Sequence, residues 1–133
     1  MKVGIVLEGG GMRGLYTSGV LDYLLDQDIM ADYVIGVSAG ACNGVSYVSK
    51  QRGRNFRVNT GYLNDKRYLS LNNFIKTKSL FGMDFIFNQI PHQLDLFDYD
   101  TFLDEFFNSY VWMDFNFASK RCFKRFLDET GDY

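Results

Sequence analysis

A serine between two glycines is the residue of this chain best suited to covalent chemistry. The sequence reads Gly36-Val37-Ser38-Ala39-Gly40, a Gly-x-Ser-x-Gly pattern. Small residues at this spacing let the chain reverse sharply, so that the serine hydroxyl projects at the N-terminus of a following helix. The helix dipole and the free N–H groups there favour developing negative charge. The pattern therefore predicts a nucleophile for acyl transfer at Ser38.

A second glycine-rich segment precedes this serine and has the spacing Gly-x-Gly-x-x-Gly. Its residues are Gly9, Gly10, Gly11, Met12, Arg13 and Gly14. A dinucleotide-binding loop has the same spacing but requires an acid at the end of the second strand. Here the second apolar run ends in Val37-Ser38, and Asp32 precedes that run instead. A Walker loop is excluded because no Gly-Lys-Ser or Gly-Lys-Thr follows. We prefer a turn whose backbone N–H groups bind an oxyanion beside the serine.

A nucleophilic serine also needs a base. The chain has one histidine, His92, in the segment Gln89-Ile90-Pro91-His92, where the proline indicates a loop or an element boundary. Nothing in the pattern places this residue near Ser38. We therefore favour a loop histidine without a catalytic role over a Ser-His-Asp triad.

The hydrophobic pattern predicts the elements that position both motifs. Residues 2–7 and 33–37 are short apolar runs, typical of strands buried on both faces in a parallel sheet. Residues 15–25 have helical spacing, and residues 39–48 form a second predicted helix of small side chains. Residues 1–50 thus read as a βαβα unit, in which both glycine turns follow the carboxyl ends of parallel strands.

The rest of the chain divides into a basic and an acidic part. Residues 50–78 contain one acid, Asp65, and the basic residues Lys50, Arg52, Arg54, Arg57, Lys66, Arg67, Lys76 and Lys78. Residues 84–114 contain acids and no Lys or Arg. The basic part could approach anionic lipid headgroups; we favour a solvated face balanced by the acids that follow. Thr101-x-x-Asp104 predicts a capping box for a helix with one apolar stripe, formed by Phe102, Leu103, Phe106, Phe107 and Tyr110.

Composition limits the remaining possibilities. The chain has 133 residues, 47% of them hydrophobic, which excludes disorder and fits one compact domain or part of one. A net charge of −2 argues against nucleic-acid binding. Cys42 and Cys122 are expected to be packed thiols in a reducing compartment. Neither a span of about 20 apolar residues nor a signal peptide is evident, so we expect a cytoplasmic protein that begins at Met1.

Taken together, the two motifs resemble those of the patatin-like phospholipases, a family of serine acyl hydrolases. The family's glycine-rich motif ends in a basic residue and glycine, as Arg13-Gly14 does, and Ser38 matches its nucleophile. The stretch from Leu80-Phe81-Gly82-Met83-Asp84 through Phe97-Asp98-Tyr99 also looks like a bacterial branch of that family. The resemblance covers residues 1–115. It implies an α/β, three-layer fold with a mainly parallel central sheet flanked by helices, present here as a truncated N-terminal portion.

The resemblance also implies a mechanism. Ser38 would attack an ester carbonyl, the N–H groups of Gly10 and Gly11 would hold the oxyanion, and water would hydrolyse the acyl-serine to release a fatty acid. Arg13 would brace the loop or the incoming headgroup. The family's base is the aspartate of an Asp-Gly-Ala/Gly motif in a Ser-Asp dyad. No Asp of this chain is followed by Gly, so residues 1–133 resemble a partial domain without that aspartate.

Two functions follow as expectations. The first is a serine acyl hydrolase for a lipid or other ester, without metal or cofactor, with peripheral contact at the inner face of a membrane and no nucleic-acid partner. The alternative is a non-catalytic truncated fragment that binds lipid or protein through an exposed sheet edge and its aromatic residues. The oligomeric state is not indicated by the sequence.

Overall fold

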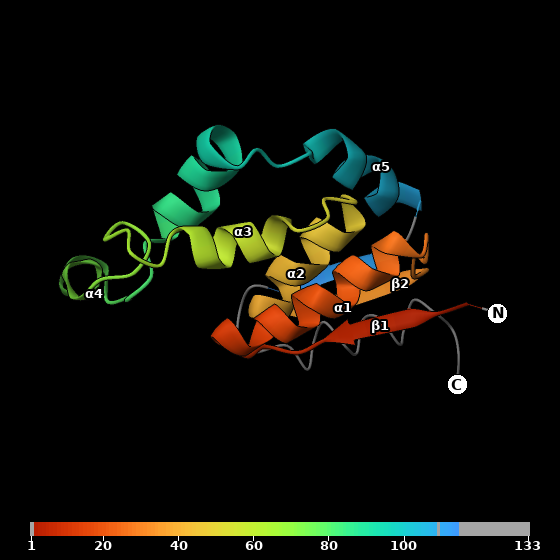
Figure 1. Ribbon diagram of the computed structural model, residues 1–133, viewed down its shortest axis with the longest axis horizontal. Helices are drawn as coiled ribbons and strands as arrows, with labels where there is room; N and C mark the ends of the chain where they lie inside the picture. Colours follow the sequence, from red (N-terminus) through yellow and green to blue (C-terminus); the bar gives the residue numbers. More distant parts are fainter. Residues whose placement is uncertain (1, 109, 115–133) are drawn as a thin grey trace.

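A three-stranded parallel sheet forms the centre of the fold. The computed structural model describes residues 2–108 and 110–114 (Figure 1). The strands are β1 (Gly4–Leu7), β2 (Tyr33–Val37) and β3 (Tyr110–Asp114), in the spatial order β1-β2-β3. The expected α/β class with a parallel sheet is confirmed.

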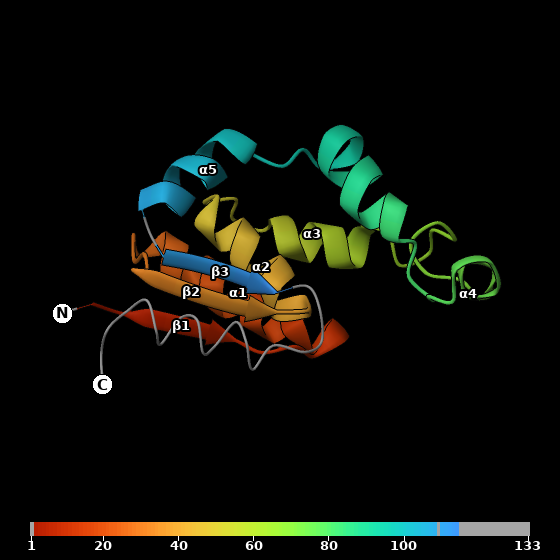
Figure 2. The same cartoon turned by 180° about the vertical axis from the view of Figure 1, so that it is seen from behind.

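Helices α1 and α2 lie on one face of this sheet (Figures 1 and 2). The helical elements are η1 (Gly11–Arg13), α1 (Gly14–Asp26), α2 (Ala39–Val48), α3 (Arg54–Gly61), α4 (Leu71–Thr77), η2 (Phe85–Leu94) and α5 (Tyr99–Asn108). The two helices expected in residues 1–50 are therefore present, and with β1 and β2 they form the predicted βαβα order. The full three-layer arrangement stays an expectation from the resemblance. No helix of the described residues is long and apolar enough to cross a membrane.

The main core lies between this sheet face and the two helices. Its buried residues are Leu7, Leu21, Ala31, Val34, Tyr47 and Val48. On the central strand β2, Val34 and Ile35 are both buried, as the continuous apolar run predicts. On β1 the prediction of burial on both faces is wrong, because Val6 is 69% exposed. Within the described sheet β1 is an edge strand, and the side of β1 that carries Val6 faces away from α1 and α2.

A second cluster lies beside α3. Its buried residues are Tyr68, Phe85 and Ile90. Asp95 joins the segment after η2 to α3, since its carboxylate accepts hydrogen bonds from Arg57 at 2.8 and 3.1 Å and lies 3.6 Å from Nε of the buried Arg54. Burial lowers the pKa of Arg54, and the Asp95 carboxylate opposes that shift.

Acids neutralise residues 50–57, the first half of the basic segment, but the expected solvated face balanced only by later acids is not what forms. Asp26 precedes the segment, and Arg54 is buried. Arg52 pairs with Asp26 on α1, and Lys50 pairs with Glu105 on α5. With the Asp95 pairs, these contacts attach α3 and its flanking turn to three other parts of the chain.

Two local predictions are wrong. Thr101 does not begin a capping box: the Asp98 carboxylate caps α5 by accepting from the Thr101 N–H at 2.9 Å, and this hydrogen bond lowers the pKa of Asp98. Pro91 and His92 lie inside η2, a π-helix, and not in a loop. A proline ring clashes with the preceding turn of an α-helix, and the wider π turn gives the ring more room.

The buried hydroxyl of Tyr47 links α2 to the connection that leads into β2. It donates to the carbonyl of Ile29 at 2.8 Å and accepts from the N–H of Ala31 at 3.0 Å. Burial raises the pKa of this hydroxyl, so it stays protonated and able to donate. Tyr47→Phe should lower the free energy of unfolding by about 1–3 kcal/mol, because two backbone groups lose their partner. Urea denaturation measures the change.

The control for this substitution is Tyr16→Phe, since Tyr16 is 82% exposed on α1. It should leave the urea midpoint unchanged. Equal midpoints for the two variants would show that the Tyr47 hydrogen bonds do not stabilise the fold.

Candidate active site

Ser38 occupies a strained backbone conformation between β2 and α2. Its φ of 54° and ψ of −120° lie in a backbone region that residues other than glycine rarely adopt. Such strain persists only where the surroundings enforce it. Helix α2 begins directly after Ser38, whose carbonyl accepts from the Cys42 N–H at 3.1 Å. The turn therefore presents a half-buried serine at the N-terminus of a helix.

The two glycines that flank Ser38 are required by the close approach of backbone to backbone. A Cβ on Gly40 would lie 2.2 Å from the carbonyl oxygen of Leu7, the last residue of β1. A Cβ on Gly36 would lie 2.7 Å from Cα of Ala41. Real Cβ atoms do not approach backbone so closely, so only glycine fits at either position.

The glycine turn after β1 lies against Ser38. A Cβ on Gly9 would stand 3.2 Å from Cβ and 3.8 Å from Oγ of Ser38. Gly11, the first residue of η1, has a φ of +54°, which glycine adopts without strain. The structure thus brings the two motifs together at the carboxyl ends of adjacent parallel strands, where the sequence places them.

Asn43 is a site residue that the sequence analysis missed. It is 2% exposed on α2, and its Nδ2 donates to the carbonyl of Gly14 at 2.8 Å. The backbone carbonyl of Asn43 accepts from Nδ2 of Asn55 on α3 at 3.1 Å. Oδ1 of Asn55 in turn accepts from the Ser46 hydroxyl. Asn43 therefore ties the end of the glycine motif to the helix that follows Ser38. No sequence pattern indicates this contact, because Asn43 is a single amide residue among small residues.

The other sequence candidates lie in different surroundings. Met12 and Arg13 are exposed on η1. His92 is exposed and stacks on Tyr99, with ring centroids 5.3 Å apart. Cys42, expected to be packed, is half-buried, and burial raises the pKa of its thiol. Cys122 lies outside the described residues.

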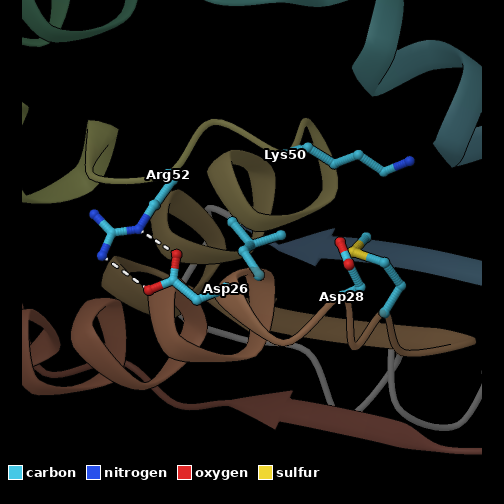
Figure 3. Close-up of a pocket in the computed structure, with 6 residues that line it drawn as sticks. Asp26, Asp28, Lys50 and Arg52 are labelled. Carbon is cyan, nitrogen blue, oxygen red and sulfur yellow. Dashed lines mark hydrogen bonds and ion pairs between the residues drawn. The ribbon is translucent and has the colours of Figure 1, made fainter.

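A separate open pocket lies at the other end of β2 from Ser38. Its charged lining residues are Asp26, Asp28, Lys50 and Arg52 (Figure 3). Asp26 and Arg52 point toward each other and form two hydrogen bonds, so their charges are already compensated. Across residues 2–108 and 110–114, no group of three or more His, Cys, Asp or Glu side chains is placed to hold a metal ion.

Comparison with known proteins identifies relatives of the chain. The sequence profile described as patatin-like phospholipase matches residues 5–130. A protein of Escherichia coli strain K12, described as uncharacterized protein YjjU, is 32% identical over 99 residues, which cover 71% of this chain and 28% of that protein. The chain thus spans little more than a quarter of this relative's length. No solved structure matches the chain significantly.

Gly40→Ala tests the close approach that shapes the turn. The added methyl group meets the Leu7 carbonyl, so the free energy of unfolding should fall by about 3 kcal/mol, at the upper end of overpacking costs. Gly19→Ala is the matched control, since it lies in α1 with nothing within 4 Å of the new Cβ. That variant should gain about 0.5–1 kcal/mol. Urea denaturation compares them; similar values for both would contradict the steric account.

Proposed function

Because the chain belongs to the patatin-like phospholipase family, we propose that it supplies the nucleophile and the oxyanion-binding turn of a serine acyl hydrolase. The substrate class is a lipid or other carboxylic ester. Residues 1–133 form part of the catalytic domain, and residues 1–50 form its catalytic-motif unit. The observation that carries the proposal is the strained backbone of Ser38 beside Gly9.

The reaction uses Ser38 as the group that forms a covalent bond with the substrate. Its Oγ attacks the ester carbonyl carbon and loses its proton to a base, and the N–H groups of Gly10 and Gly11 stabilise the tetrahedral oxyanion. The alcohol leaves with a proton, and the acyl group stays on Ser38. Water then attacks the acyl-serine, releases the fatty acid and restores the hydroxyl.

The surroundings of Ser38 support this assignment in two ways. The N-terminus of α2 favours the negative charge that develops during attack. The glycines leave backbone rather than side chains next to the serine, so a substrate carbonyl meets N–H donors directly.

The base is proposed to be the aspartate of a Ser-Asp dyad. None of the 133 residues is an Asp followed by Gly, so we propose that this aspartate belongs to sequence beyond them. Exposed Arg13 at the end of the glycine turn is proposed to brace that turn or meet the substrate headgroup. Peripheral contact with a membrane belongs to the same proposal, since lipid esters reside in bilayers.

Covalent labelling by a fluorophosphonate tests the nucleophile directly. The folded chain should react slowly, because the turn and its oxyanion donors are present while the proposed base lies beyond these residues. Ser38→Ala should reduce labelling to background, because the phosphonylated oxygen is removed. Ser79→Ala is the control: Ser79 is also half-buried, and its loss should leave labelling unchanged. A chain that is folded by circular dichroism but shows no labelling at all would contradict a nucleophile and oxyanion-binding turn assembled within these residues, and would favour the non-catalytic alternative.

His92→Gln separates a dyad from a histidine-dependent triad. The exposed ring of His92 contacts Tyr99, so the labelling rate of Ser38 should stay within about twofold of the parent chain, as for a residue without a role in proton transfer. The measurement is the rate of probe incorporation over time. A drop of about a hundredfold or more would instead identify His92 as the base.

A further inference from the structure

Helix α4 carries its apolar side chains on its solvent-facing side. Leu71 and Ile75 are 75% and 72% exposed, and Phe74 between them is 47% exposed. Their i, i+3, i+4 spacing puts the three on one stripe of the helix. In a surface helix of a globular protein such a stripe faces the core. In α4 the orientation is reversed.

Polar contacts hold α4 in place with its apolar side toward solvent. Asn73, on the other side of α4, donates through Nδ2 to the carbonyls of Arg67 at 3.2 Å and Leu80 at 3.4 Å. The Ser70 hydroxyl caps the helix by accepting from the Asn73 N–H at 3.1 Å. Because hydrogen bonds fix the helix, its apolar stripe is not needed for packing.

Backbone pairing closes the segment into a hairpin, which we call the α4 arm (residues 66–83). The Ser70 N–H donates to the carbonyl of Leu80 at 3.1 Å, and the Gly82 N–H donates to that of Tyr68 at 3.0 Å. Four more apolar residues of the arm have exposed fractions of 39–53%: Leu69, Leu80, Phe81 and Met83. These side chains are therefore exposed on a segment whose backbone is held by hydrogen bonds.

The charge of the arm is opposite to that of the whole chain. The arm contains Lys66, Arg67, Lys76 and Lys78 and no acid, whereas the chain has a net charge of −2. Arg67 pairs with Asp65 just before the arm. The three lysines form no ion pair with any part of the chain that the structure describes, in contrast to Lys50, Arg52, Arg54 and Arg57. The balance of charge expected for residues 50–78 therefore fails on the arm.

The arm lies on the same side of the molecule as Ser38. In both views α4 sits at one extremity of the long axis, beyond the end of the sheet toward which the strand arrows point (Figures 1 and 2). Ser38 follows the carboxyl end of β2 at that same end of the sheet.

We propose that the α4 arm docks on an anionic lipid bilayer. The stripe of Leu71, Phe74 and Ile75 enters the interface, and Lys76 and Lys78 contact lipid phosphates. Exposed apolar side chains suit the acyl-chain boundary of a bilayer, and the unpaired lysines beside them suit its anionic headgroups. A second copy of this chain fits less well, because a symmetric contact between two arms would set their lysines against each other. The benefit of docking rests on the proposed function, since it would bring lipid esters to the side of the molecule that carries Ser38.

Vesicle flotation of the full chain tests the docking. The vesicles contain either phosphatidylcholine alone or equal parts of phosphatidylcholine and phosphatidylglycerol. The chain should bind the second kind more tightly. Lys76→Gln/Lys78→Gln should weaken that binding by about fivefold for each lysine. Leu71→Gln/Ile75→Gln should weaken it on the order of tenfold or more, because the inserted stripe is lost.

A matched control removes exposed apolar side chains elsewhere. Tyr16 and Tyr23 on α1 are 82% and 61% exposed, and Tyr16→Gln/Tyr23→Gln should leave vesicle binding unchanged. Equal loss in this control, or binding that ignores phosphatidylglycerol, would overturn the proposal. So would an oligomer in gel filtration that Leu71→Gln/Ile75→Gln dissociates, because the arm would then be covered by a second copy.

Fluorophosphonate labelling of the same variants separates the two proposals. The arm variants should keep the parent rate of Ser38 labelling, since their substitutions lie on exposed side chains outside the turn. Labelling without arm-dependent vesicle binding would refute the docking and leave the nucleophile in place. Arm-dependent binding without labelling would refute the hydrolase proposal and leave the docking.

Discussion

The close approach of α2 to the end of β1 is the constraint on which the rest of the site depends. At Gly40 the helix passes so near the carbonyl of Leu7 that one methyl group would not fit. This contact fixes where the first turn of α2 lies, and with it the sharp reversal at Ser38. It also brings the chain leaving β1 against the serine, so that Gly9 becomes its neighbour. One steric contact thus couples two motifs that are separated in sequence by all of α1.

The site and its strands could be predicted because short-range rules determine them. Glycines at fixed offsets and buried apolar runs indicate a parallel pair with turns at the same edge, and the structure has that arrangement. Asn43 could not be found in this way, since its role depends on which backbone carbonyl lies opposite after folding. Val6 was misjudged for a similar reason: an apolar run indicates a strand, but the exposure of each face depends on which layers cover it.

Predictions for the second half of the chain were less accurate because local signals there compete. Asp98 and Thr101 can both cap a helix, and the structure uses Asp98. Pro91 indicates a break in an α-helix but is accommodated in a π-helix. The basic residues 50–78 look alike in the sequence. In the structure, residues 50–57 pair with acids from α1, α5 and the segment after η2, while within the described part of the chain the three lysines of the α4 arm do not. Only tertiary pairing distinguishes the two halves.

The sheet register also has a consequence for the order of folding. Tyr33 pairs with Gly4 on one side and with the much more distant Tyr110 on the other. Closing a longer loop costs more chain entropy, so β1 and β2 can pair well before β3 arrives. During that interval the second edge of β2 presents unpaired backbone groups next to buried apolar residues. Newly made chains are therefore most exposed to intermolecular strand pairing until β3 takes its place.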